Sequence, residues 1–135
     1  MKVKLDHIGI AVNDLSQALA FYSDALGLEV EDTETVEPQA VRAHFLSVGS
    51  ASLELLEATD PDSPIAKFVS KRGPGLHHVT FLVEDINEAI THLKKRGVRM
   101  VDQSPRLGAE RALVAFVHPS SAHGVLVELK QEGKG

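Results

Sequence analysis

The stretch His7–Asp14, His-Ile-Gly-Ile-Ala-Val-Asn-Asp, returns later in the chain as His78–Asp85, His-Val-Thr-Phe-Leu-Val-Glu-Asp. The first, sixth and eighth residues of the two stretches are identical, and apolar residues are matched between them. The offset between the copies is more than half of the chain. An offset this long that occurs only once is typical of a duplicated module and not of a solenoid.

A second pair of matching stretches lies near the end of each half. Leu53–Leu55 (Leu-Glu-Leu) corresponds to Val127–Leu129 (Val-Glu-Leu), with an offset slightly longer than that of the first pair. Between the two matches, the alignment needs a one-residue gap to bring Gly27 onto Gly97. The halves are therefore copies of one module, with a slightly longer loop in the second.

Each half has the pattern of a strand, a helix and then further strands. Residues 3–12 alternate between two faces, as a strand does. An Asp with Gln or Glu three residues later begins each helix, at Asp14 and Asp85. A glycine, Gly27 or Gly97, ends it.

Further short strands and a linker helix complete the pattern. Ser63-Pro64 begins a helix with Pro in its first turn, which extends to about residue 71. The remaining β-like runs are residues 40–48, 52–57, 113–117 and 125–130.

We therefore predict an α+β fold of two tandem βαβββ modules, with helices covering one face of each sheet. Module one spans about residues 1–58, the linker helix about 62–72 and module two about 75–131. A length of 135 residues agrees with a single domain over 1–135, since domains average roughly 150 residues. If the sheets curl, the uncovered face becomes the inside of a cup.

Four ionisable residues lie on the strand faces opposite the bulky branched side chains that suit helix packing. They are His7, Glu54, His78 and Glu128, and they occupy duplicate-related positions. Two imidazoles and two carboxylates suit a divalent metal in a site with two nitrogen and two oxygen ligands. A single His or Glu in mid-strand more often faces solvent, but four in symmetric positions favour a metal site in the cup.

The other histidines lack this symmetry. His77 is adjacent to His78 and points to the other face, because strand side chains alternate. We interpret it as structural. His44, His92, His118 and His123 are interpreted as surface or loop residues.

Composition excludes several other functions. Cysteine is absent, which excludes a disulfide framework, a thiolate zinc site and a cysteine nucleophile. The formal charge of −5 argues against nucleic acid, and the basic run Lys94–Arg96 suits the end of a predicted helix. No apolar run approaches the roughly 18 residues of a membrane span. We expect a cytoplasmic protein with neither nucleic acid nor membrane as partner.

These features resemble the vicinal oxygen chelate superfamily, which includes glyoxalase I, extradiol dioxygenases and methylmalonyl-CoA epimerase. Several stretches are similar to the epimerase branch in particular, and the similarity covers essentially the whole chain. They are Leu5–Val12 (LDHIGIAV), Leu53–Leu56 (LELL), Asp62–Phe68 (DSPIAKF), Gly75–Val79 (GLHHV), Leu107–Ala109 (LGA), Phe116–Pro119 (FVHP) and Gly124–Leu129 (GVLVEL).

The resemblance implies that His7, Glu54, His78 and Glu128 are metal ligands for one divalent ion per site. The family favours Co²⁺, with Mn²⁺, Ni²⁺, Zn²⁺ or Mg²⁺ as alternatives. It also implies epimerisation of methylmalonyl-CoA at C2 through a metal-stabilised enediolate, with Glu128 as the general base. A small-molecule acyl-CoA is then the substrate, and we expect a homodimer.

The chain departs from the family at one position. Some relatives carry a glutamate in the first module that is proposed as a second base, and Ala43 occupies that place here. Glu37 and His44 are nearby, but the sequence leaves their strand direction open. The CoA phosphates need cations, for which Arg106 and Arg111, in and beside the segment 105–110, are candidates; solvated loop arginines are the alternative.

Three other functions stay open. A glyoxalase I-type lactoylglutathione lyase would use the same four ligands. An extradiol dioxygenase needs iron held by two His and one carboxylate, which Glu54 as an extra ligand disfavours. A non-catalytic binding module would usually lack the ligand set.

Overall fold

The computed structural model describes residues 1–108 and 111–133 of the chain. Ala109, in the Leu107–Ala109 motif, and the end of the segment 105–110 therefore lie outside the described residues. The chain forms two compact units. The first is His7–His77, and the second combines Met1–Asp6 with the described residues from His78 onward.

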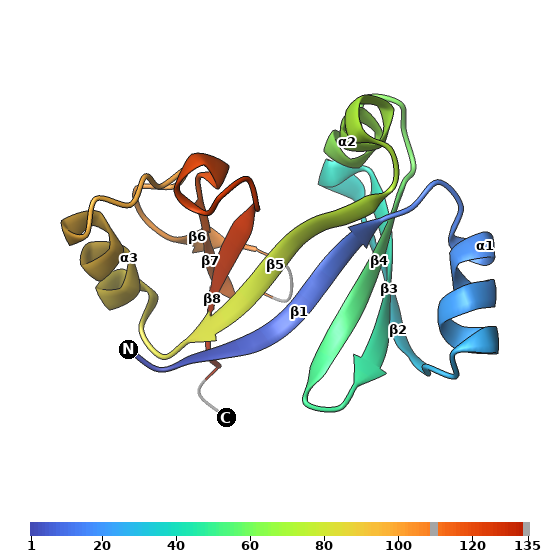
Figure 1. The fold of residues 1–135 in the computed structure, drawn as a ribbon, viewed down its shortest axis with the longest axis horizontal. Coiled ribbons are helices and arrows are strands. Elements are labelled where there is room, and N and C mark those ends of the chain that lie inside the picture. The colour runs from blue at the N-terminus through green and yellow to red at the C-terminus, as the bar shows by residue number, and fades with distance from the viewer. Residues whose placement is uncertain (109–110, 134–135) are drawn as a thin grey trace. The chain divides into compact units, whose positions relative to one another are not determined.

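The first unit contains most of strand β1 and the elements up to the linker helix (Figure 1). In chain order they are β1 (Val3–Ala11), α1 (Leu15–Leu19), the π-helical η1 (Ala20–Ala25), β2 (Val30–Val36), η2 (Glu37–Gln39), β3 (Val41–Val48), β4 (Ala51–Ala58) and α2 (Pro64–Arg72). The strand order is β2-β3-β4-β1. The pairing of β1 with β4 is parallel, and the other two pairings are antiparallel.

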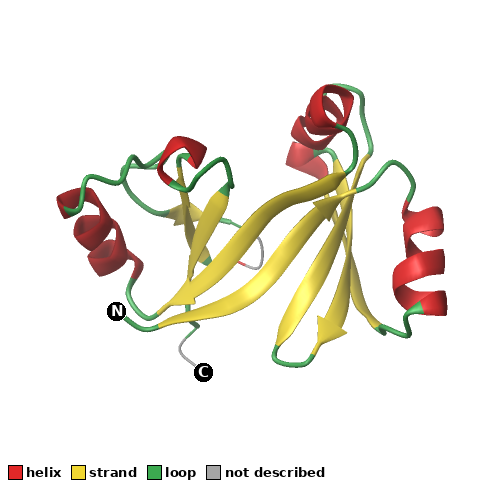
Figure 2. Cartoon of the chain, in the orientation of Figure 1, coloured by secondary structure: helices red, strands yellow, loops and turns green. Residues whose placement is uncertain are grey.

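The second unit repeats this plan (Figure 2). Its elements are most of β5 (Gly75–Val83), then α3 (Ile86–Lys95), β6 (Arg106–Leu107), β7 (Leu113–Val117), η4 (Pro119–Ser121) and β8 (Val127–Gln131). The strand order is β6-β7-β8-β5, again with a parallel pairing, of β5 with β8, and two antiparallel ones. The predicted α+β fold with a duplicated βαβββ pattern is confirmed.

The predicted capping residues begin both module helices. Asp14 Oδ1 accepts a hydrogen bond from the backbone N–H of Gln17 at 3.2 Å. Asp85 Oδ1 accepts the equivalent bond from Glu88 at 3.1 Å. Each carboxylate satisfies one of the N–H groups that a helix leaves unpaired at its N-terminus.

A second side chain, from the last strand of each module, also reaches the first turn of the helix. Glu57 Oε2 accepts from the N–H of Leu15 at 2.8 Å, and Gln131 Oε1 accepts from the N–H of Ile86 at 3.1 Å. These contacts tie each helix to its sheet at the residue where the helix begins.

In both modules, the helix packs on the equivalent face of the sheet. The α1 cluster is centred on the buried Leu15, Leu46 and Leu55. The α3 cluster combines Ile86, Ala89 and Ile90 with strand residues that include Val83, Ala115, Val117 and Leu129. Since alternate residues of a strand point to opposite faces, Glu54 and Glu128 lie on the face that these helices leave uncovered.

The linker helix α2 packs on the other face of the first sheet, which the prediction of one covered face did not anticipate. Its Ile65 lies in a buried cluster with Ala11, Val41, Ala43 and Leu56. Part of the face that carries Glu54 is therefore closed by α2. The helix begins as predicted, with a hydrogen bond at 3.2 Å from the Ile65 N–H to Ser63 Oγ.

Two strands were not located in the sequence. Strand β2 reads Val-Glu-Asp-Thr-Glu-Thr-Val and lies at one end of the strand order, with five of its seven residues exposed. The segment 105–110 was expected to be a loop, but it contains the two-residue strand β6. No helix among the described residues is long and apolar enough to cross a membrane.

Candidate metal centre

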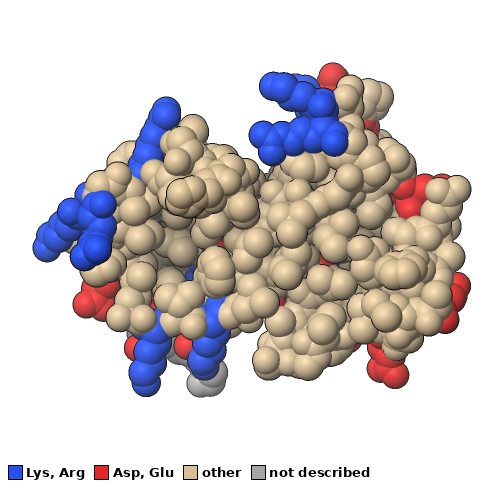
Figure 3. Space-filling model, in the orientation of Figure 1, with Lys and Arg blue, Asp and Glu red and all other residues tan. Residues whose placement is uncertain are grey.

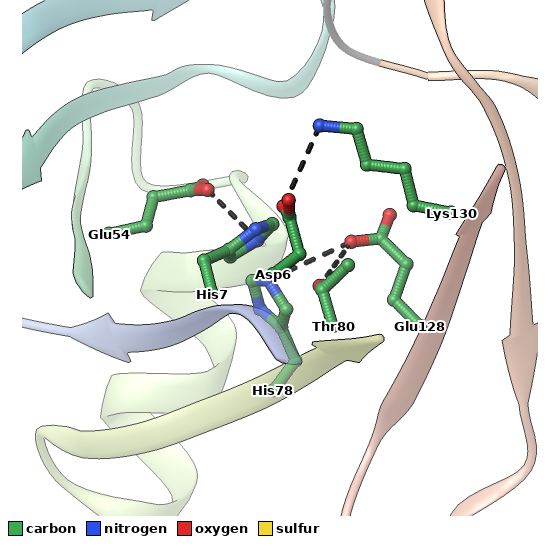
Figure 4. Close-up of polar contacts among 7 residues, drawn as sticks. All are labelled: Asp6, His7, Glu54, His78, Thr80, Glu128 and Lys130. Carbon is green, nitrogen blue, oxygen red and sulfur yellow. Dashed lines mark hydrogen bonds and ion pairs between the residues drawn. The ribbon is translucent and has the colours of Figure 1, made fainter. Parts of the chain in front are cut away.

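The first His–Glu pair lies in the first unit (Figure 4). His7 Nε2 on β1 is 3.1 Å from Glu54 Oε2 on β4, and the side chains are only 10% and 15% exposed. Their approach follows from the parallel pairing of the two strands, in which Glu54 is the register partner of Gly9. His7 lies two residues before Gly9 and therefore shares its face.

The second His–Glu pair lies in the second unit. His78 Nε2 on β5 is 3.9 Å from Glu128 Oε1 on β8, with side-chain exposures of 9% and 15%. Glu128 is the register partner of Thr80, and the Thr80 hydroxyl donates a hydrogen bond to Glu128 Oε1 at 2.6 Å (Figure 4). Thr80 is completely buried.

An aromatic residue flanks each carboxylate on the neighbouring antiparallel strand. Phe45 on β3 is the register partner of Glu54, and Phe116 on β7 is the register partner of Glu128. Register partners point to the same face of a sheet. The sequence carries a signal for this that was missed, because the two phenylalanines have the same offset as His7 and His78.

The donor atoms of both pairs fit a divalent metal. Each pair offers one imidazole nitrogen and one carboxylate oxygen, which first-row divalent ions accept. Two ligands in adjacent positions, each bound about 2.1 Å from a metal, lie roughly 3 Å apart. The first pair meets this spacing at 3.1 Å, and the second pair is wider at 3.9 Å.

An ion pair also lies on the second unit. Lys130 Nζ is 3.6 Å from Asp6 Oδ2, and both side chains are 23% exposed (Figure 4). Lys130 follows Glu128 by two residues on β8 and shares its face. The second pair therefore has a positive charge next to it on the same strand.

The structure decides the strand direction of His44, which the sequence left open, and places Ala43 on the opposite face. Ala43 is buried under α2, on the face of Glu54. His44 is the register partner of Leu55 and so points to the opposite face, where its Nδ1 lies 2.8 Å from the Thr33 hydroxyl. His44 is therefore excluded as a replacement for the missing glutamate.

Glu37 is also a poor replacement, because it is exposed in the short helix η2 that joins β2 to β3.

His77 has a packing role. Its ring lies edge-on to Phe68 of α2, with 4.9 Å between the ring centres. Burial lowers the pKa of His77 below its ordinary value of 6.5, because the charged ring is desolvated. A neutral ring that packs on an aromatic side chain agrees with the structural interpretation.

The two arginines proposed for the CoA phosphates differ in their surroundings. The Arg106 side chain lies 3.3 Å from an Asp102 carboxylate oxygen and its guanidinium lies 5.4 Å from the centre of the Phe116 ring. Arg111 is exposed, with a positive φ of 60°.

Lys and Arg side chains are also drawn over α2 and over α3 in Figure 3. Lys71 and Arg72 occupy the last turn of α2, and Lys94 and Lys95 that of α3. Cations are favoured at this end of a helix by its dipole. Lys94 also donates to the Gln103 carbonyl at 3.2 Å, which agrees with a structural role for this basic run.

Fold and site together define a duplicated βαβββ protein with a His–Glu pair in each module, in which the His is buried and the Glu partly buried. Residues 6–116 match the Glyoxalase/Bleomycin resistance protein/Dioxygenase superfamily, and the chain belongs to this family. The predicted superfamily is thereby confirmed.

Within the family, several similar proteins are named as epimerases. The ethylmalonyl-CoA/methylmalonyl-CoA epimerase of Cereibacter sphaeroides is 38% identical, over 95% of this chain and 97% of its own length. The mitochondrial methylmalonyl-CoA epimerase of Homo sapiens is 40% identical, over 95% of this chain and 73% of its own.

A solved methylmalonyl-CoA epimerase, in complex with methylmalonyl-CoA and NH4⁺, has a TM-score of 0.88 at 36% identity and covers 99% of this chain and 97% of its own. By contrast, the lactoylglutathione lyase of Salmonella typhimurium is 21% identical over 98% of both chains. The predicted enzyme class, an isomerase of the epimerase type, is confirmed by the epimerase relatives.

Proposed function

We propose that this protein is a methylmalonyl-CoA epimerase, which inverts C2 of the acyl group by proton transfer. The observation that carries the proposal is the pair of equivalent His–Glu contacts, His7–Glu54 and His78–Glu128, in a chain that is 38% identical to a named epimerase. The predicted acyl-CoA substrate agrees with the ligand named for a structural relative.

The four side chains of the two pairs would together hold one divalent cation, for which the family resemblance favours Co²⁺. When bound, the cation would supply Lewis-acid stabilisation of negative charge on the thioester oxygen of the substrate. The only role of His7, His78 and Glu54 would be to bind the cation. Glu128 would both bind the cation and act as the base. The low exposure of all four side chains favours such electrostatic interactions, because they are stronger away from water.

Glu128 would remove the C2 proton. The bond between C2 and hydrogen breaks, the proton passes to the carboxylate, and the electron pair stays on the substrate as an enediolate. A general base contributes typically 10²–10⁴-fold to such a step. Return of a proton to the opposite face needs another group, and Ala43 excludes the side chain that some relatives use there. A water molecule that exchanges with solvent would serve this face.

Isotope exchange tests the proposal. The protein, supplied with a divalent metal, is incubated with one epimer of methylmalonyl-CoA in deuterium oxide, and both epimers are analysed by mass spectrometry at low conversion. We expect the product epimer to carry deuterium at C2 from the first turnover, and the recovered substrate to carry less. Product without deuterium would contradict the scheme with separate donors, and no exchange in either epimer would contradict the epimerase proposal.

A lactoylglutathione lyase of the glyoxalase I type is the second candidate, because the same four donors would serve it. Its named relative shares only 21% identity, however, against 38% for the bacterial epimerase. A paired assay on methylmalonyl-CoA and on the glutathione hemithioacetal distinguishes the two. The homodimer and the cytoplasmic location expected from the sequence stay predictions, and sedimentation analysis tests the first of them.

A further inference from the structure

The register partners of the two carboxylates on the neighbouring strands agree on one side and differ on the other. On one side, each glutamate has a phenylalanine as its antiparallel register partner. On the other side, the parallel register partner of Glu54 is Gly9, whereas that of Glu128 is Thr80. Among these register partners, one side chain is therefore present beside Glu128 and missing beside Glu54.

The Thr80 hydroxyl is well placed to fix the Glu128 carboxylate. It donates to Oε1 at 2.6 Å, which lies within the range of short hydrogen bonds to a charged acceptor. Oε1 is also the oxygen that lies 3.9 Å from His78 Nε2. Thr80 is completely buried on β5, so its own position is set by the surrounding packing.

The final torsion of a glutamate side chain is broad, because it joins an sp³ to an sp² carbon. A hydrogen bond to one of the two carboxylate oxygens restricts the range of this torsion and holds the plane of the carboxylate in one orientation. Proton abstraction depends on such an orientation, since the base must lie within hydrogen-bond reach of the proton that it removes.

We propose that Thr80 is a positioning residue that gives Glu128, and not Glu54, its role as the base. The hydroxyl holds the Glu128 carboxylate toward both the metal and the substrate, while Gly9 provides no side chain that could do the same for Glu54. This inference rests on the proposed epimerase function for its kinetic consequence. The orientation of Glu128 as a ligand can be tested without turnover.

The test compares Thr80→Val, which keeps the shape and removes the donor, with Thr80→Ser, which keeps the donor. Outer partners of metal ligands typically contribute about 10–100-fold to affinity or activity. We expect Thr80→Val to lower kcat by roughly this factor and to leave KM for methylmalonyl-CoA nearly unchanged. The affinity of the metal-free protein for Co²⁺, measured by calorimetry, should fall by about 10-fold. Thr80→Ser should restore both quantities to near the wild-type values.

Thr33→Val is the matched control, because it also removes a strand hydroxyl that contacts an ionisable side chain, His44, on the opposite sheet face. It should leave kcat and Co²⁺ affinity unchanged. If Thr80→Val does not fold, as judged by circular dichroism, Thr80→Ala removes the same donor without added bulk.

Equal losses in Thr80→Ser and Thr80→Val would show that the residue acts through packing and would overturn the proposal. Wild-type kcat and Co²⁺ affinity in Thr80→Val would also overturn it. If the wild-type protein does not turn over methylmalonyl-CoA, the proposed function fails, and the Co²⁺ titrations still decide whether the hydroxyl holds Glu128.

Discussion

The two modules share a frame and differ in a few side chains at equivalent places. Both have the same strand order, the same parallel pairing of first and last strand, and an Asp that caps the helix. At the first helical turn, one module uses a charged acceptor, Glu57, and the other a neutral one, Gln131. Beside the partly buried glutamate, one has Gly9 and the other Thr80.

The comparison shows which features the duplicated frame requires. Parallel strand pairing places a His and a Glu on one face in both modules, which suits the ligand roles proposed for them. The difference beside the glutamate then allows the two carboxylates to take different roles. Variants made in matched pairs, one in each module, test this division.

The largest effect is expected from the two histidines, which should be equivalent. His7→Ala and His78→Ala should each lose bound metal and activity together, because each removes one ligand. Metal analysis of the purified proteins measures the first and the epimerase assay the second. His77→Ala is the control and should keep its metal at near wild-type stoichiometry. The opposite result for His77 and His78 would contradict the assignment of the faces of β5.

The two glutamates should differ from each other. Glu128→Gln keeps an oxygen ligand but cannot accept a proton, so kcat should fall by about 10²–10⁴-fold, far more than the metal affinity. Glu54→Gln should bind metal and keep some turnover. Steady-state kinetics and Co²⁺ titration of both variants make the comparison. Equal losses of turnover would mean that Glu128 has no special role in proton transfer.

The cores under the two module helices should respond similarly. Leu55 and Leu129 occupy equivalent positions, directly after Glu54 and Glu128, and are 0% and 5% exposed. Replacing either with Ala should lower the free energy of unfolding by about 2–5 kcal/mol, because a cavity remains. Urea unfolding measures the loss. A change below about 1 kcal/mol in either variant would contradict the packing described for that helix.

The contacts that tie each helix to its sheet should differ in strength. Hydrogen bonds to charged groups contribute about 1.5–3 kcal/mol and neutral ones about 0.5–1.5 kcal/mol. A negative charge is also favoured at a helix N-terminus. We therefore expect Glu57→Ala to destabilise the protein more than Gln131→Ala. Glu57→Gln, which keeps an acceptor without the charge, should destabilise it less than Glu57→Ala. Thermal unfolding of the three variants gives the order, and equal losses for Glu57→Ala and Gln131→Ala would exclude a contribution from the charge.

The smallest effect concerns His77, whose pKa is lowered by burial in the folded protein. Below pH 6.5 the unfolded chain binds a proton that the folded state binds only at lower pH. The contribution of this residue to stability is therefore complete above pH 6.5 and decreases as the pH falls toward the folded pKa. His77→Phe keeps a ring against Phe68 and removes the titration. Its melting temperature should depend less on pH between 7 and 5 than that of the wild type, and an unchanged dependence would exclude His77 as a source.

Much of this comparison could be predicted from the sequence, because local signals determine it. The repeat gave the modules, the capping residues gave the helix starts, and strand alternation put His7 and Glu54 on one face. Strand β2 was missed because its exposed, polar residues have no hydrophobic alternation. The contacts of Glu57 and of Thr80 depend on register between distant strands, which one sequence does not specify. The face of His44 needed the pairing of β3 with β4 for the same reason.

The π-helical turn of the first module lies where the two copies differ in length. The first module has one residue more than the second between its capping Asp and its final glycine, Gly27. The turn η1 accommodates such a residue, because the N–H of Leu26 bonds to the carbonyl of Phe21, five residues back, at 2.8 Å. The wider turn follows Leu15 and Leu19, which lie at the same distance from the capping Asp as Ile86 and Ile90 do in the second module. A difference of one residue is tolerated here, because it lies in a helical turn outside the paired strands.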